Sequence, residues 1–399
     1  MRRLFFSLLI AALLVGFPQP VRADAEVMNV EIEYKFGEYI TFRARVLASA
    51  PVKQIFLSLR REGELGTSLY PMSAGANGYY TYTHDMSKNI LRPFARLTFV
   101  IEGKLENGQS FTSSGYLFRY DDNRFVWKSR EQAPLKVFWY EGDTAFGQAA
   151  LDAALTGLVS AGQVVPLAQS TEVEIYVYAS PEDLQSALTL GGVPWQAGHA
   201  SPDLGVVMVA IPPGMNQSLL MDQLIPHELA HVLMYKGLEE NYANLPVWFR
   251  EGVATLAERF PNPDYEHALT AASREHSLLP LADLCNTFPP DQSRAFLAYA
   301  ESASFTRYLR DQYGNVGLSA LAIAYSDALN CEQGTLRGLG VPLSSLERDW
   351  RENVLGENLA GVAVRNLFPY AFVLALFLVL PIVGILNATW RKSNGHSAQ

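Results

Sequence analysis

The sequence predicts an α+β domain at residues 135–360, preceded by an all-β immunoglobulin-like sandwich at residues 24–120 and followed by a single transmembrane helix at residues 367–389. Short alternating segments with turn residues between them fill the first part of the chain. Strands and helices then alternate, and an uncharged apolar run lies near the end. A length of 399 residues also favours two folded domains over one.

The first 23 residues have the pattern of a cleaved secretory signal peptide. Arg2 and Arg3 precede an apolar run, and small residues suited to signal peptidase follow at Val21-Arg22-Ala23. The alternative is an uncleaved amino-terminal anchor, although the apolar run is short for a span of about 20 residues. We therefore expect the following domains to be exported.

The sandwich is predicted from period-2 alternation between about Val30 and Tyr120. Six segments show it: VEIEYKF, YITFRARVLA, KQIFLSLRR, GYYTYTH, ARLTFVIEG and FTSSGYLFRY. Short strands at this spacing are typical of an immunoglobulin-like fold. No catalytic grouping is evident in it, and His84 beside Asp85 is interpreted as a surface pair. Residues 121–134 are rich in charge and are predicted to be a linker.

The domain at residues 135–360 begins with alternating types of element. KVFWY, EVEIYVYA and LGVVMVAI are predicted strands, and the helices between them are expected at Thr144–Ala161 and Ser180–Leu188. Helical patterns then continue to about Val354. A sheet followed mostly by helices predicts a cleft between a sheet-bearing half and a helical half.

The segment from Asn216 to Lys236 predicts an amphipathic helix with two histidines on one face. His227 and His231 are four positions apart, so they lie one turn apart and can converge on one metal ion. Glu228, next to His227, can reach the open side of such a metal without being a ligand. This arrangement is suited to general-base catalysis on zinc-activated water, with the proton then passed to the leaving amine.

A catalytic zinc needs a third protein ligand, and Glu251 is the candidate. It lies in the predicted helix Leu245–Phe260, with nineteen residues between His231 and Glu251 for an antiparallel return. Gly252 is expected to let the two helices approach closely. The competing carboxylates are Glu239, Glu240 and Glu258, and an ordinary surface role for the histidines and for Glu251 is the alternative to a metal site.

These residues resemble a known family. His227-Glu228-Leu229-Ala230-His231, followed by Trp248-Phe249-Arg250-Glu251-Gly252, is similar to the gluzincin zinc metallopeptidases, and most similar to the peptidase MA-like group. The resemblance covers about residues 135–354. It implies a zincin-like fold, one zinc ion per chain held by His227, His231 and Glu251, and peptide-bond hydrolysis with Glu228 as the base.

Two further residues are candidates near the metal. An oxyanion that develops during hydrolysis needs a hydrogen-bond donor, for which Tyr299 is the candidate, with a buried structural role as the alternative. His199 precedes the apolar strand at residues 204–211. If that strand is the edge of the cleft, it could pair with an extended substrate, whereas a lone loop histidine is more often only solvated.

The apolar run Leu367–Leu386 carries no charge and is followed by Trp390, Arg391 and Lys392. It predicts a transmembrane helix that anchors the protein in the cell membrane, with residues 390–399 as a cytoplasmic tail. A buried core helix is the alternative. Cys285 and Cys331 lie in the exported part, where a disulfide is permitted and two unpaired thiols are the other possibility.

The predicted function is therefore that of a membrane-anchored, extracytoplasmic zinc metallopeptidase acting on a peptide or protein. A catalytically silent scaffold or binding protein is the alternative, and hydrolysis of another amide, such as a cell-wall cross-link, is a further one. A net charge of -9 with 31 Lys and Arg residues spread along the chain argues against nucleic acid as a partner. The sequence indicates no particular partner for the sandwich.

Overall fold

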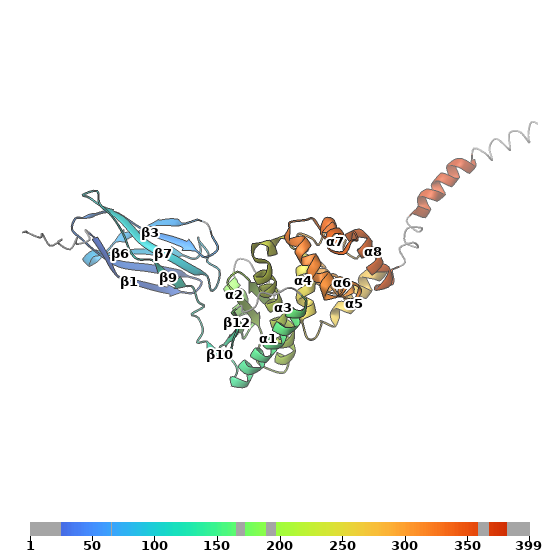
Figure 1. Cartoon of the computed structure of the whole chain (residues 1–399), viewed down its shortest axis with the longest axis horizontal. Coiled ribbons are helices and arrows are strands. Elements are labelled where there is room, and N and C mark those ends of the chain that lie inside the picture. Colours follow the sequence, from blue (N-terminus) through green and yellow to red (C-terminus); the bar gives the residue numbers. More distant parts are fainter. Residues whose placement is uncertain (1–24, 65, 165–171, 189–196, 358–366, 381–399) are drawn as a thin grey trace, which may run out of the picture. The chain divides into compact units, whose positions relative to one another are not determined.

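The computed structural model describes residues 25–64, 66–164, 172–188, 197–357 and 367–380 (Figure 1). The chain divides into two compact units, residues 1–126 and residues 127–399. The predicted signal peptide at residues 1–23 lies outside the described residues.

The first unit contains two antiparallel sheets. In one sheet the strand order is β1-β2-β6-β5, and in the other it is β4-β3-β7-β8, with β9 also paired to β7. The strands are β1 (Ala25–Lys35), β2 (Tyr39–Ala48), β3 (Val52–Arg61), β4 (Ser68–Pro71), β5 (Ser73–Ala74), β6 (Tyr79–Asp85), β7 (Arg96–Leu105), β8 (Ser110–Thr112) and β9 (Tyr116–Arg119), with a short 3-10 turn at Ala76–Gly78.

Aromatic side chains join the two sheets. Phe42 of β2 meets Phe99 of β7 edge to face, with ring centroids 5.0 Å apart, and Phe42 also contacts Phe118 of β9. Alternate residues of β2 are buried, as the period-2 pattern predicts. An all-β region is thus present, while its immunoglobulin-like topology stays a prediction. His84 differs from the expected surface residue: it is fully buried, and its Nε2 lies 2.6 Å from the carbonyl oxygen of Asn89.

The second unit begins within the predicted linker. β10 (Lys128–Gln132) pairs with β11 (Leu135–Trp139), so part of the segment 121–134 belongs to a sheet. All five residues of β10 are exposed. An edge strand without a buried face has no alternation of polarity, which is why its sequence is typical of a linker.

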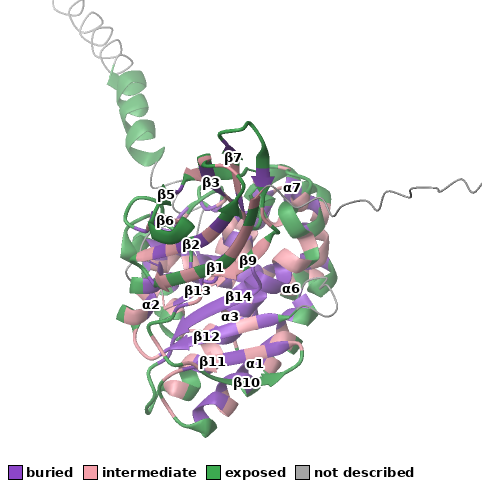
Figure 2. Cartoon of the chain, turned by 90° about the vertical axis from the view of Figure 1, so that its left-hand side faces the viewer, coloured by how far each residue is buried: buried purple, intermediate pink, exposed green. Residues whose placement is uncertain are grey.

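The sheet of the second unit has the order β10-β11-β12-β14-β13. β11, β12 (Val173–Tyr178) and β14 (Val206–Ala210) are parallel, and the edge strands β10 and β13 (Gly198–Ser201) are antiparallel to their neighbours. Every residue of β14 and five of the six in β12 are buried, as expected for strands covered on both faces (Figure 2).

Helices α1 (Thr144–Val164) and α3 (Gln217–Leu238) pack on this sheet around a common core. Its members include Val137 and Ile175 from the strands and Leu229 and Leu233 from α3. The two helices approach closely at Gly157, where a Cβ atom would lie 2.8 Å from the Cα atom of Pro226. Helix α2 (Pro181–Leu188) contacts β12 and β14.

The remaining helices form a second core. They are the 3-10 segment η2 (Glu239–Asn244), α4 (Val247–Ala257), α5 (Asp264–Glu275), α6 (Gln292–Ser326, interrupted at Gly314), α7 (Cys331–Leu339) and α8 (Leu343–Asn353). Trp248, Phe305 and Trp350 meet in the centre, with ring centroids 5.1 Å and 5.6 Å apart in the two contacts. A sheet-bearing half and a helical half are therefore both present, as predicted for an α+β domain.

One carboxyl group lies inside the helical half. Glu301 of α6 is fully buried, and its Oε1 accepts a hydrogen bond of 2.9 Å from the backbone N–H of Leu279. Burial raises the pKa of this carboxyl to about 8. The side chain is therefore predominantly protonated at neutral pH.

The predicted transmembrane helix is described only in part. Residues 367–380 are helical and exposed, whereas residues 381–389 and the predicted cytoplasmic tail at residues 390–399 lie outside the described residues. No helix built from the described residues is both long enough and apolar enough to cross a membrane.

Candidate metal centre

Two histidines of α3 face the same space. His227 and His231 lie one turn apart, with ring centroids separated by 5.2 Å, and their side chains are 14% and 10% exposed. The helical spacing of the motif fixes this arrangement locally, because residues i and i+4 share one face of a helix. The predicted pair is thus brought together at the helix surface that faces α4.

Glu251 of α4 completes a convergent set of three ligands. Its Oε2 lies 3.4 Å from Nε2 of His227 and 3.5 Å from Nε2 of His231. The three candidate ligand atoms all lie within 4.8 Å of one another, close enough for one ion to contact each of them. The two imidazoles and their hydrogen bonds hold the pKa of Glu251 well below its usual range despite burial, so this carboxylate is ionised.

The other nitrogen of each histidine has a partner that the sequence did not reveal. Nδ1 of His227 lies 2.8 Å from Oε1 of Glu258, and Nδ1 of His231 lies 3.0 Å from the hydroxyl of Tyr242. Such contacts orient metal-binding imidazoles and leave Nε2 for the ion. Burial alone would lower the pKa of His227, but hydrogen bonds with Glu251 and Glu258 raise it above its ordinary value.

The chain is similar to a known family. A family model described as the peptidase MA superfamily matches residues 153–356, just over half of the chain, and this range includes all three candidate ligands. The chain belongs to the peptidase MA superfamily. No curated protein sequence matches it.

Similarities to solved structures are distant. An aminopeptidase N family protein from Idiomarina loihiensis is 11% identical, with 80% of this chain and 75% of that one covered and a TM-score of 0.34. A structure of BhCBM56 is 14% identical over 23% of this chain and 88% of that one, with a TM-score of 0.18. A purple acid phosphatase from yellow lupin (Lupinus luteus) is 10% identical over 50% and 40%, with a TM-score of 0.21. At these TM-scores the similarities carry no weight for fold or function.

In this member of the peptidase MA superfamily, a proline places Glu258 beside His227. Pro226 lacks an N–H, which leaves the carbonyl of Asp222 without its usual helical donor. The backbone N–H of Arg259 donates to that carbonyl at 3.0 Å. The turn that follows α4 is therefore bonded to α3 one residue after Glu258.

The start of α4 is held by a different segment. The backbone N–H groups of Val247 and Trp248 donate to the carbonyls of Cys285 and Leu284, at 2.9 Å and 3.1 Å. These two donors have no partner within their own helix. Cys285 is joined to Cys331 by a disulfide, the first of the two possibilities that the sequence left open, and the bridge anchors the segment that caps α4.

Glu228 lies between the metal-binding face and the edge strand. It is 7% exposed, and a Cβ atom on Gly198 of β13 would lie 2.8 Å from its Cγ. The absence of a side chain at residue 198 thus makes room for this carboxyl group. Burial raises the pKa of Glu228, opposed by the neighbouring His227 and His231.

A cavity of about 520 Å³ opens over these residues. Strand β13, the 3-10 segment η2 and helices α3, α4, α5 and α6 supply its walls, and Tyr299 and His199 both line it. The negative charge of Glu251, together with burial, raises the pKa of Tyr299 and keeps its hydroxyl protonated. The described structure therefore brings all five residues predicted for the site, and His199, to one cavity.

Three details differ from the sequence-based expectations. The strand at residues 204–211 is not an edge: β14 lies between β12 and β13, and His199 is in the edge strand β13. Gly252 allows a close approach to α6 instead of α3, since a Cβ atom there would lie 2.6 Å from the carbonyl oxygen of Ser302. Glu258, considered as a competing ligand, contacts the far nitrogen of His227.

Proposed function

We propose that this protein is a zinc-dependent metallopeptidase that hydrolyses peptide bonds, with Glu228 as the general base. The observation that carries the proposal is the convergence of His227, His231 and Glu251 on one point, with Glu228 beside it at the wall of a cavity. Membership of the peptidase MA superfamily supports the same chemistry.

The donor set fits zinc. Two imidazole nitrogens and one carboxylate oxygen are the ligands of many catalytic zinc sites, which keep a further position open. The Nδ1 contacts to Glu258 and Tyr242 aim both Nε2 atoms at the same point. When bound, zinc would lower the pKa of a water molecule and polarise the scissile carbonyl.

The residues around the position where the three candidate ligands converge have different chemical roles. Glu228 accepts a proton from the attacking water and returns it to the leaving amine, a role that suits a buried carboxyl with a raised pKa. The hydroxyl of Tyr299 donates to the oxyanion that develops on the scissile carbonyl. An extended substrate pairs its main chain with the edge strand β13, beside His199.

We also propose that the chain is exported and anchored in the cell membrane by residues 367–389, with the cleft on the extracytoplasmic side. The amino-terminal pattern of residues 1–23 and the apolar run support this location. A disulfide between Cys285 and Cys331 is in keeping with an oxidising compartment. Protease treatment of intact cells should degrade the domain; protection of the domain in intact cells would refute this orientation.

The central test joins metal content to turnover. Purified protein should contain about one zinc ion per chain and cleave members of an unbiased peptide library. Glu228→Gln should keep the zinc and lower the cleavage rate by at least about 100-fold, because the general base is lost. A protein that binds no zinc would refute the proposal. Zinc binding without cleavage of any peptide would instead favour the scaffold alternative.

A further inference from the structure

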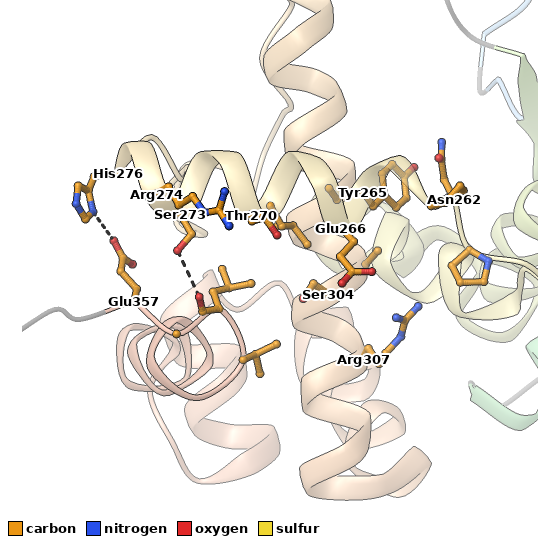
Figure 3. Close-up of a pocket in the computed structure, with 18 residues that line it drawn as sticks. Asn262, Tyr265, Glu266, Thr270, Ser273, Arg274, His276, Ser304, Arg307 and Glu357 are labelled. Atoms are coloured by element: carbon orange, nitrogen blue, oxygen red, sulfur yellow. Dashed lines mark hydrogen bonds and ion pairs between the residues drawn. The ribbon is translucent and has the colours of Figure 1, made fainter.

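The second unit has another cavity, of about 740 Å³ (Figure 3). Helix α5, part of α6 and the segment Val354–Glu357 form its walls. Asn262 and Tyr265 line both cavities, so the two spaces adjoin at these side chains. Asn262 and Tyr265 thus form the boundary that a chain bound over the metal ligands would pass to reach the second cavity.

Two cationic side chains line the second cavity. Arg274 of α5 and Arg307 of α6 make no hydrogen bond or ion pair with any described residue. Their guanidinium groups lie toward opposite ends of the cavity in Figure 3. Both groups are exposed and are available to a ligand.

The carboxylates of the cavity do not cancel this charge. Oε1 of Glu357 lies 3.3 Å from Nδ1 of His276, and its Oε2 lies 3.8 Å from Arg351. Glu266 has no ion pair among the described residues and lies near Arg307 in Figure 3. Among the described residues, the cavity thus has two guanidinium groups and one carboxylate without an ion pair, which is a surplus of positive charge.

The length of the cavity matches several residues of an extended chain. Tyr265 and Arg274 are nine positions apart on α5, a distance of about 13 Å at the rise of an α-helix. An extended peptide covers that distance in roughly four residues. The apolar side chains of Leu269, Val354 and Leu355 also line the cavity and offer contact to such a peptide.

We propose that the second cavity binds the substrate chain beyond the scissile bond and selects acidic side chains within about four residues of it. The inference rests on the proposed function and extends it: the substrate is an extended polypeptide, and the cleavage is internal. Free amino acids and dipeptides would leave the second cavity empty.

The test separates binding from hydrolysis. Affinities are measured by fluorescence anisotropy on zinc-loaded Glu228→Gln protein, with twelve-residue peptides that carry Glu on either flank and matched peptides that carry Gln. We expect the acidic peptides to bind roughly five- to tenfold more tightly, as exposed charge pairs contribute modestly. Arg274→Ala and Arg307→Ala should each reduce that preference, and Glu266→Gln should increase it.

Arg348 on α8 provides the matched control. It is exposed and lines neither cavity, so Arg348→Ala should leave the preference unchanged. Equal affinity for acidic and neutral peptides, or a preference that survives both cavity variants, would overturn the inference. If the wild-type protein hydrolyses acidic and neutral peptides equally well, the second-cavity inference is refuted and the proposed peptidase function stands. If the protein binds acidic peptides more tightly but hydrolyses none, the proposed peptidase function is refuted and the peptide-binding role of the second cavity stands.

Discussion

Replacing Glu258 should weaken zinc binding although this residue is not a ligand. Its carboxylate lies 2.8 Å from Nδ1 of His227, and its side chain is 8% exposed. Removing such a partner of a metal-binding imidazole typically costs about 10- to 100-fold in metal affinity, or about 1.4 to 2.7 kcal/mol. Glu258→Gln keeps an acceptor oxygen but loses the charge, so we expect about a tenfold loss. Glu258→Ala leaves Nδ1 without a partner and should approach 100-fold.

The assay is a competition titration with a chromophoric zinc chelator at fixed pH, so that metal affinity is read without reference to turnover. Glu182→Gln is the matched control, because this exposed residue of α2 lines neither the metal cavity nor the adjoining one. Circular dichroism establishes that each variant is folded. A folded Glu258→Ala protein with zinc affinity within twofold of wild type would refute the positioning role.

Three other changes should have measurable effects. Burial raises the pKa of Glu301 to about 8, so the folded state keeps a proton that the unfolded state releases near pH 4.5. The free energy of unfolding should therefore fall by a few kcal/mol as the pH rises from about 4.5 to 8. Urea denaturation should show a flatter pH profile for Glu301→Gln, and identical slopes would contradict this. Reduction of Cys285–Cys331, which closes a 46-residue separation, should lower the unfolding free energy by up to about 4 kcal/mol, whereas the double alanine variant should not respond to reductant. Gly198→Ala should displace the Glu228 side chain and lower kcat at least tenfold, with zinc content unchanged. A wild-type kcat in this variant would show that the close approach of Gly198 to Glu228 does not position the carboxyl group.

Residue spacing within a helix predicted the part of the site that one helix supplies. His227 and His231 share a helix face because their spacing fits one turn. Glu251 followed from the need for a third ligand on a returning helix. The roles of Glu258 and Tyr242 depend on where the chain turns after α4 and before it, and no residue spacing encodes those turns.

The strands of the second unit also differ in how well the sequence predicts them. Strands β11, β12 and β14 could be predicted because buried parallel strands are mostly apolar, with one charged residue each in β11 and β12 and none in β14. The edge strands β10 and β13 could not, because they have few apolar residues and their positions depend on pairing with a neighbour. Edges of sheets thus carry the least sequence signal.

The capping of α4 has a consequence for the order in which the site assembles. His227 and His231 belong to one helix, but the first turn of the helix that carries Glu251 is fixed by the carbonyls of Leu284 and Cys285, more than thirty residues further along the chain. During synthesis the histidine pair is therefore complete well before its third partner has a fixed place. Metal capture should then be a late event, and zinc should slow unfolding without accelerating refolding in stopped-flow measurements. A refolding rate that rises with zinc concentration would mean that the ion nucleates the domain.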